Sequence, residues 1–182
     1  ALALVIAVAW YLSYSASRLD RLHARVEGAM SALDAHLVRR AEATLELANS
    51  GAFDPASALM LAGAASFALE RTTQRAGEDL LEGQHFGGRE PVESGLTEIL
   101  TLTLTPDVVE RIVAGGGPAQ GALERVEAAG RRVQLARRFY NDAVKDVERV
   151  RSKAVVRLFR LAGHADLPQT VEFDDELPAT RG

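Results

Sequence analysis

A strict seven-residue repeat near the end of the chain constrains the fold more than any other sequence feature. Between residues 119 and 150, two sets of small or apolar residues recur at every seventh position. The first set is Ala119, Val126, Val133, Tyr140 and Val147, and the second is Ala122, Ala129, Ala136, Ala143 and Val150. Such a repeat is typical of helices that pack lengthwise on one another, so the segment predicts a helix whose partner is another helix.

Apolar periodicity and capping signals predict further helices upstream of this segment. Between Leu19 and Ala48, apolar residues recur at steps of three and four, as on the buried stripe of one long helix. Gly51 suits a left-handed C-terminal cap, and Asp54 followed by Pro55 suits the start of a second helix. We therefore expect helices joined by short connections, as in a bundle.

The stretch 96–104 gives two conflicting signals. Leucine and threonine alternate through it, which favours a strand, but its apolar residues also fit one face of a helix. Because no partner strand is evident elsewhere, we predict a helix here that breaks at Pro106. The predicted fold is all-α, with an N-terminal transmembrane helix followed by an antiparallel four-helix bundle. Its helices are expected over residues 18–49, 55–80, 92–114 (broken at Pro106) and 118–162.

The first twelve residues, ALALVIAVAWYL, are apolar throughout. A membrane span needs about 20 such residues, so we expect the remainder to precede Ala1. Trp10 and Tyr11 stand at the end of the run, as in an aromatic belt, and the arginines that follow place that side in the cytoplasm. This favours a single-pass anchor in the inner (plasma) membrane, with lipids around it and the bundle on the cytoplasmic side. A cleaved signal peptide and a buried N-terminal helix are the alternatives.

These signals divide the chain into three parts. Residues 1–17 form the expected anchor, residues 18–163 the helical bundle, and residues 164–182 an acidic tail that is expected to be extended. Asp174 and Asp175 lie in this tail, where we expect no burial that would raise the pKa of a carboxyl group for acid–base catalysis.

No combination of residues predicts catalysis, a metal site or a cofactor site. Cysteine is absent, which excludes disulfides, zinc–thiolate sites and cysteine nucleophiles. The glycines around Pro118 lack the lysine of a phosphate-binding loop and are expected to connect two helices. The histidines, which lack the spacing of a helical metal site, are His23, His36, His85 and His164. We therefore expect a protein that is not an enzyme and has no cofactor.

Basic side chains outnumber acidic ones between residues 125 and 160, although the whole chain has a net charge of −4. Four arginines of this segment fall off the heptad seam and are expected to point outward. Three interpretations are open: a solvated face, docking to anionic lipid headgroups, or a nucleic-acid surface, which the lack of interleaved aromatic residues disfavours. The candidate interaction residues are Arg131, Arg132, Arg137, Arg138, Trp10 and Tyr11.

Two stretches resemble the hallmark motifs of the LemA family: ALDAHLVRRAEATLELA (residues 32–48) and ARRFYNDAV (residues 136–144). The order of an apolar N-terminus, the two motifs and a short amphipathic end, KAVVRLFRLAGHAD, is also similar, while Gly130 stands where the family has an acidic residue. The matching positions of the first motif are Asp34, Leu37, Arg39 and Arg40. The resemblance implies a four-helix bundle on a membrane anchor, with roles at the membrane envelope and no established catalytic step.

The leading hypothesis is a non-enzymatic, membrane-anchored helical scaffold or accessory subunit. One concrete form is an accessory subunit of a larger bacterial membrane complex, for example a respiratory one. The excess of arginine over lysine is typical of genomes rich in G and C. The partners of such a subunit would be other membrane-protein subunits. The alternative is a module for envelope organisation that binds anionic lipid surfaces through its basic helix. Neither hypothesis involves nucleic acid.

Overall fold

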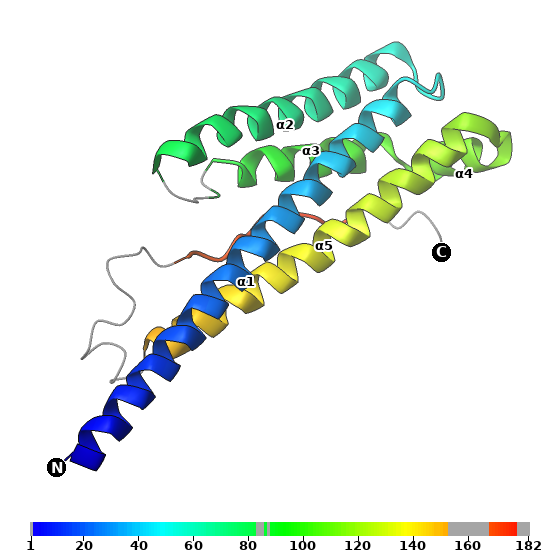
Figure 1. Ribbon diagram of the computed structural model, residues 1–182. Coiled ribbons are helices and arrows are strands. Elements are labelled where there is room, and N and C mark those ends of the chain that lie inside the picture. The colour runs from blue at the N-terminus through cyan, green and yellow to red at the C-terminus, as the bar shows by residue number, and fades with distance from the viewer. Residues whose placement is uncertain (1, 83–85, 87, 153–167, 178–182) are drawn as a thin grey trace. The chain divides into compact units, whose positions relative to one another are not determined.

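The computed structural model describes residues 2–82, 86, 88–152 and 168–177, and all regular structure within these ranges is α-helical (Figure 1). The helices are α1 (Leu2–Ala48), α2 (Pro55–Glu82), α3 (Glu90–Thr103), α4 (Pro106–Gly115) and α5 (Gly117–Arg151). The all-α prediction is confirmed, and the predicted break at Pro106 separates α3 from α4. The predicted continuation of the last helix to residue 162, the amphipathic stretch and the end of the acidic tail lie outside the described residues.

The structure does not support the transmembrane span predicted over residues 1–17. α1 begins at Leu2 and continues without a break through the apolar N-terminal residues. Across the part of the chain that the structure describes, no helix has an apolar stretch long enough to cross a membrane.

Local capping chemistry sets the boundary between α1 and α2. Gly51 has a φ of 78°, the left-handed conformation predicted for the cap. The Asp54 carboxylate accepts hydrogen bonds from the Ser57 hydroxyl (2.6 Å) and from the backbone N–H groups of Ser57 (3.1 Å) and Ala56 (3.0 Å). These bonds, led by that of the Ser57 hydroxyl, lower the pKa of Asp54 because they favour its charged form. The predicted end of α1 and the predicted start of α2 are therefore confirmed.

α3 resolves the conflict over the stretch 96–104 in favour of a helix. A strand would have placed Leu100, Leu102 and Leu104 on the same face. Instead Leu100 and Leu104 are buried, whereas Leu102 is 60% exposed. Leu96 is buried one helical turn before Leu100, so the helical period explains the leucine pattern.

The chain forms two compact units, each assembled from segments far apart in the sequence. The first comprises residues 1–31 and 138–170. Its core contains Leu19 and Val150, and Arg25 pairs with Asp146 at 3.3 Å. Arg25 follows Leu19 along α1, whereas Asp146 precedes Val150 along α5. The two segments therefore run antiparallel in this unit.

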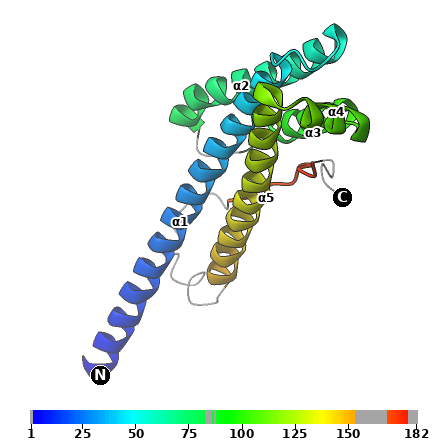
Figure 2. The same ribbon diagram turned by 90° about the vertical axis from the view of Figure 1, so that its right-hand side faces the viewer.

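The second unit comprises residues 32–137 and 171–182, and its core includes residues of all five helices. α2 packs against α3. The end of α1 lies beside the start of α5 in both views (Figures 1 and 2), where Arg125 binds the Glu46 carboxylate at 2.9 and 2.6 Å. The largest of its fully buried side chains are Leu47, Leu61, Leu96, Leu100, Leu123 and Val126.

Burial along α5 confirms the heptad prediction. Every member of the two sets is buried except Ala119, which is partly buried. Tyr140, which belongs to the first unit, is 2% exposed, and its hydroxyl donates a hydrogen bond to the backbone carbonyl of Gln169 at 2.9 Å. Tyr140 therefore fills the seam with its ring and satisfies its polar atom with the backbone, as a buried tyrosine requires.

Replacing Tyr140 tests the seam directly. We expect Tyr140→Ala to lower the free energy of unfolding by about 3–5 kcal/mol, because a buried aromatic ring is removed. The adjacent Phe139 is 56% exposed, so Phe139→Ala should change it by less than about 0.5 kcal/mol. Urea unfolding followed by circular dichroism measures both. Equal effects of the two substitutions would show that the seam is misassigned.

Candidate functional site

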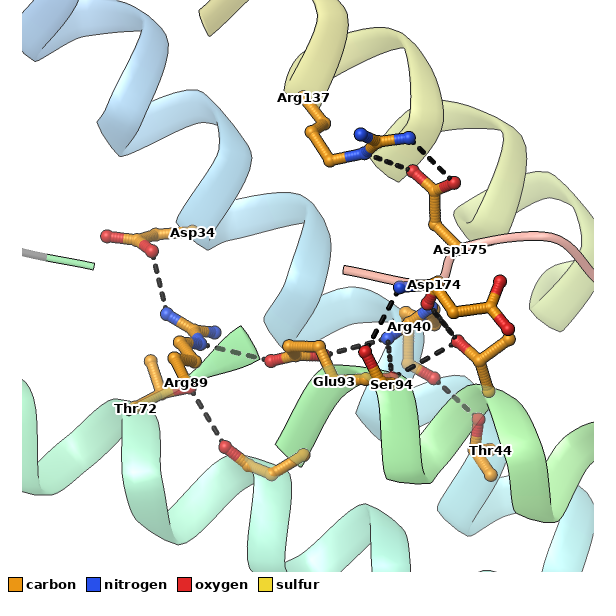
Figure 3. Close-up of polar contacts among 12 residues, drawn as sticks. Asp34, Arg40, Thr44, Thr72, Arg89, Glu93, Ser94, Arg137, Asp174 and Asp175 are labelled. Atoms are coloured by element: carbon orange, nitrogen blue, oxygen red, sulfur yellow. Dashed lines mark hydrogen bonds and ion pairs between the residues drawn. The ribbon is translucent and has the colours of Figure 1, made fainter. Parts of the chain in front are cut away.

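A network of buried ion pairs lies at the centre of the second unit (Figure 3). The Arg40 side chain of α1 is fully buried, and its Nη2 donates hydrogen bonds to Oε2 of Glu93 at 2.8 Å and to the Glu93 backbone carbonyl at 3.0 Å. The other carboxylate oxygen of Glu93, Oε1, accepts a hydrogen bond from Nε of Arg89 at 3.0 Å. One buried carboxylate therefore bridges two buried guanidinium groups.

The network extends further along α1 and to the C-terminal segment. Arg89 donates from Nη1 to Oδ1 of Asp34 at 2.7 Å, and Asp34 lies on α1 about 1.7 turns before Arg40. Arg40 also donates from Nη1 to the Thr97 hydroxyl at 3.0 Å, and that hydroxyl donates a hydrogen bond to the backbone carbonyl of Asp174 at 2.7 Å. The same cluster thus joins α1, α3 and the C-terminal segment.

The C-terminal segment 168–177 has no helix or strand, yet one side of it is buried. Val171, Phe173 and Asp175 are 1%, 8% and 4% exposed. The Asp175 carboxylate accepts hydrogen bonds from Nε and Nη2 of Arg137 at 2.7 and 3.1 Å. The expectation that the acidic tail offers no burial is therefore wrong for Asp175, because its charge is compensated by a two-pronged pair with α5.

Backbone groups of this segment are bound as specifically as its side chains. The Asp174 N–H donates to the Ser94 hydroxyl at 3.0 Å, and the Glu172 N–H donates to the Glu90 carboxylate at 2.7 Å. Leu177 lies against α5 at Gly130, where a Cβ would come within 2.1 Å of its side chain. The glycine that departs from the LemA pattern therefore makes room for the tail.

Two aromatic rings connect the ion pairs. Phe86 and Phe173 stack with their centroids 5.9 Å apart and their planes at 12°. The Arg89 guanidinium lies 5.6 Å from the Phe86 ring centroid, and the Arg137 guanidinium lies 5.5 Å from that of Phe173. Each arginine thus pairs with carboxylates through its edge and with an aromatic face.

The charges of the network balance locally, and this decides its chemistry. Arg40 and Arg89 face Glu93 and Asp34, and Arg137 faces Asp175, with Glu172 a further partner at 3.2 Å. The hydrogen bond with Asp175 raises the pKa of Arg137, although burial opposes the change. Buried charges that are matched one to one in this way favour a structural role over proton transfer.

The structure separates the candidate interaction residues that the sequence placed together. Arg131, Arg132 and Arg138 are exposed, as expected, and Arg131 has an i,i+4 partner in Glu127 at 3.7 Å. Arg137 was expected to point outward, but its side chain is only 19% exposed because it binds Asp175. In the first unit, Trp10 (71% exposed) and Tyr11 (48% exposed) lie on the surface of α1.

The structure describes two of the four histidines. His23 and His36 are half-buried and belong to different units, while His85 and His164 lie outside the described residues. Among the described residues, no group of three or more histidine and acidic side chains is placed to bind a metal ion.

The sequence interpretation missed the central residue of the network, Arg40. Helical phase offered a signal, because Arg40 follows Leu37 by three residues and precedes Thr44 by four, and both of these lie on the predicted buried stripe. The second missed feature is the docked tail, where Val171, Phe173 and Asp175 alternate with outward residues at the period of an extended segment.

The chain matches no protein-family model, no curated protein and no solved structure, so the resemblance to the LemA family rests on its two sequence motifs.

Removing the charge of Glu93 tests the network. We expect Glu93→Gln to lower the free energy of unfolding by about 3–5 kcal/mol, because two buried guanidinium groups lose their shared anion. Glu98 is an exposed glutamate of the same helix, and Glu98→Gln should cost less than about 0.5 kcal/mol. Chemical denaturation of both variants gives the comparison. Similar small changes would mean that Glu93 is not the bridging anion.

Neighbouring arginines of α5 test the docking of the tail. Arg137→Gln should speed hydrogen exchange of the amides in residues 171–177 by about tenfold or more, because Asp175 loses its charged partner. Arg138→Gln removes the same charge from an exposed position and should leave the exchange unchanged. Hydrogen–deuterium exchange with mass spectrometry measures both, and equal protection in the two variants would contradict the assigned pair.

Proposed function

We propose that this chain is a non-enzymatic helical scaffold, or accessory subunit, that binds a helix of another membrane-complex subunit along the outer face of α2. The observation that carries the proposal is the exposure of large apolar side chains on that face. Leu59, Met60 and Phe67 are 74%, 46% and 53% exposed. Exposed apolar residues gathered on one element are typical of protein interaction sites.

The composition of α2 supports this role. Between Pro55 and Leu69 the helix has no charged residue, so both its inner and its outer face are apolar or small. The inner face is used within the second unit, where Leu61 and Ala65 are fully buried. On the outer face, Gly63 has nothing within 4 Å of the position its Cβ would occupy. A glycine between Leu59 and Phe67 forms a shallow notch that suits the side chain of an incoming helix.

The non-enzymatic part of the proposal is supported by the buried polar groups. The ionisable side chains at the centre of the second unit are bound to one another, and Glu93 and Arg40 are withdrawn from solvent. The ion pairs and hydrogen bonds of this cluster therefore hold α1, α3 and the tail in place, which is what a scaffold requires.

We further propose that the N-terminal end of α1 attaches the scaffold to the membrane, as in the LemA family, of which we propose that this chain is a divergent member. Ile6 and Trp10 are 60% and 71% exposed, and Trp10 stacks on Tyr14 with a centroid distance of 6.1 Å. Exposed aromatic rings next to an apolar run suit the interface between headgroups and acyl chains.

A second candidate, a module that binds anionic lipid surfaces, is favoured by the exposure of Arg131, Arg132 and Arg138. Flotation of the protein with vesicles of different anionic lipid content separates this candidate from apolar attachment. Binding that does not depend on anionic lipid would exclude it.

The apolar face of α2 gives the test of the scaffold. With tagged protein in native membranes, blue-native electrophoresis and crosslinking mass spectrometry should place the wild type in a larger assembly. The double substitution Leu59→Ser with Phe67→Ser should release it, while thermal stability changes little because both residues are exposed.

Leu102→Ser on α3 is the matched control, since Leu102 is another exposed leucine of the same unit. It should leave the assembly intact. Migration of the wild-type protein as a lone monomer in several detergents would contradict the scaffold, and retention of the double variant in the assembly would exclude α2 as its contact surface.

A further inference from the structure

A hollow with a basic rim lies between the end of α1 and the start of α5 in the second unit. It has a volume of about 400 Å³. Alanines form much of its lining, and Ala43 and Ala129 are buried at its base. The short alanine side chains leave a space between the longer charged side chains around them, and a small group can enter this space. The charged lining residues are Arg39, Glu42, Glu46, Arg125 and Arg132.

The charges of the lining are not balanced. Arg125 is occupied by its bidentate pair with Glu46. Arg39 from α1 and Arg132 from α5 have no hydrogen bond or ion pair with any described residue, and both are exposed. Among the described residues that line the hollow, Glu42 is the acidic side chain left to offset these two cations. In the buried network described above each guanidinium is matched with a carboxylate, whereas this hollow brings together two guanidinium groups that are not matched.

Both of these arginines influence the pKa of His36. It lies on α1 one turn before Arg39 and is half-buried, with Nδ1 shielded from solvent and without a hydrogen-bond partner among the described residues. Burial lowers the pKa of His36 most, and the charges of Arg39 and Arg132 lower it further. Both guanidinium charges therefore act on the same imidazole ring.

We propose that this hollow binds a phosphate group between the Arg39 and Arg132 side chains. Two guanidinium groups from different helices can each donate a pair of hydrogen bonds to different oxygens of a tetrahedral anion. A phosphate has enough oxygens to accept a pair of hydrogen bonds from each of the two guanidinium groups, whereas a carboxylate can accept only one such pair, as Asp175 does from Arg137. The site is independent of the scaffold role of α2.

Adjacent arginines of α5 provide the decisive variants. Inorganic phosphate should bind the wild-type protein, and Arg132→Gln or Arg39→Gln should weaken binding by about tenfold or more, since each removes charged hydrogen bonds. Arg131→Gln removes the same charge one residue away, from a side chain that pairs with Glu127 and does not line the hollow. Arg131→Gln should bind phosphate like the wild type. Isothermal titration calorimetry at low ionic strength measures all four proteins.

Replacing the lining glutamate, Glu42, should change the affinity for phosphate in the opposite direction. Glu42→Gln removes the unpaired negative charge of the lining, so it should strengthen phosphate binding. A general effect of net charge predicts the same gain for Glu124→Gln, an exposed glutamate of α5 that does not line the hollow. A gain confined to Glu42→Gln supports the site, and equal gains contradict it.

The His36 ring supplies a readout at the site itself. A bound dianion cancels the field of Arg39 and Arg132, so the pKa of His36 should rise towards its ordinary value on binding. Sulfate is the suitable probe for this titration by nuclear magnetic resonance, because its charge is constant over the pH range of histidine. The shift should disappear in Arg132→Gln and persist in Arg131→Gln, while the other histidines serve as internal references.

Vesicles distinguish the two sources of a phosphate group. Phosphatidylcholine vesicles with phosphatidic acid present a phosphate monoester, whereas those with phosphatidylglycerol present only a diester. Arg132-dependent binding to the phosphatidic acid vesicles identifies a lipid headgroup, and binding of inorganic phosphate without such vesicle binding identifies a soluble phosphate. The proposal is overturned if the protein binds neither inorganic phosphate nor the phosphatidic acid vesicles. It is also overturned if Arg131→Gln and Arg132→Gln have the same affinity for phosphate.

Discussion

The second unit depends on the burial of a single guanidinium group, that of Arg40. A charge removed from water must be paired and hydrogen-bonded, or the fold loses several kcal/mol. Glu93 and Thr97 meet that requirement, and they can do so only if α3 lies against the C-terminal part of α1, where Arg40 is. Thr97 in turn donates to the Asp174 carbonyl, so the need to satisfy Arg40 extends to the C-terminal segment. The buried ion pair thus favours the register in which Arg40 of α1 faces Glu93 of α3.

The tail completes the network from the other side. The stacked Phe86 and Phe173 rings lie between the Arg89 and Arg137 guanidinium groups, so both arginines have an aromatic face and a carboxylate. An acidic, polar segment that would be extended alone thereby obtains a defined path along α3 and α5. Its stability comes from the matching of Asp175 to Arg137 and from backbone bonds to Ser94 and Glu90, and very little regular secondary structure is needed.

Much of the helical fold could be predicted from the sequence because the relevant forces are local. The heptad repeat of α5, the Asp54 cap and the break at Pro106 each follow from residues within a few turns of one another, and all three are present in the structure. The ion network could not be predicted in the same way. Glu93 is separated from Arg40 by 53 residues, and a second glutamate, Glu90, lies one helical turn before Glu93. Nothing in the sequence therefore says which of the two glutamates binds Arg40.

Helical phase explains why arginines that look equivalent in the sequence have different roles. Successive residues of a helix point about 100° apart. Of the adjacent pair on α1, Arg40 points into the core and meets Glu93, while Arg39 points to the alanine-lined hollow. On α5, Arg132 lines that hollow, whereas the preceding Arg131 faces Glu127. The basic segment is therefore not one uniform surface. Its charges divide into those that hold the fold together and those without a partner among the described residues, and a ligand of this chain is to be sought among the second kind.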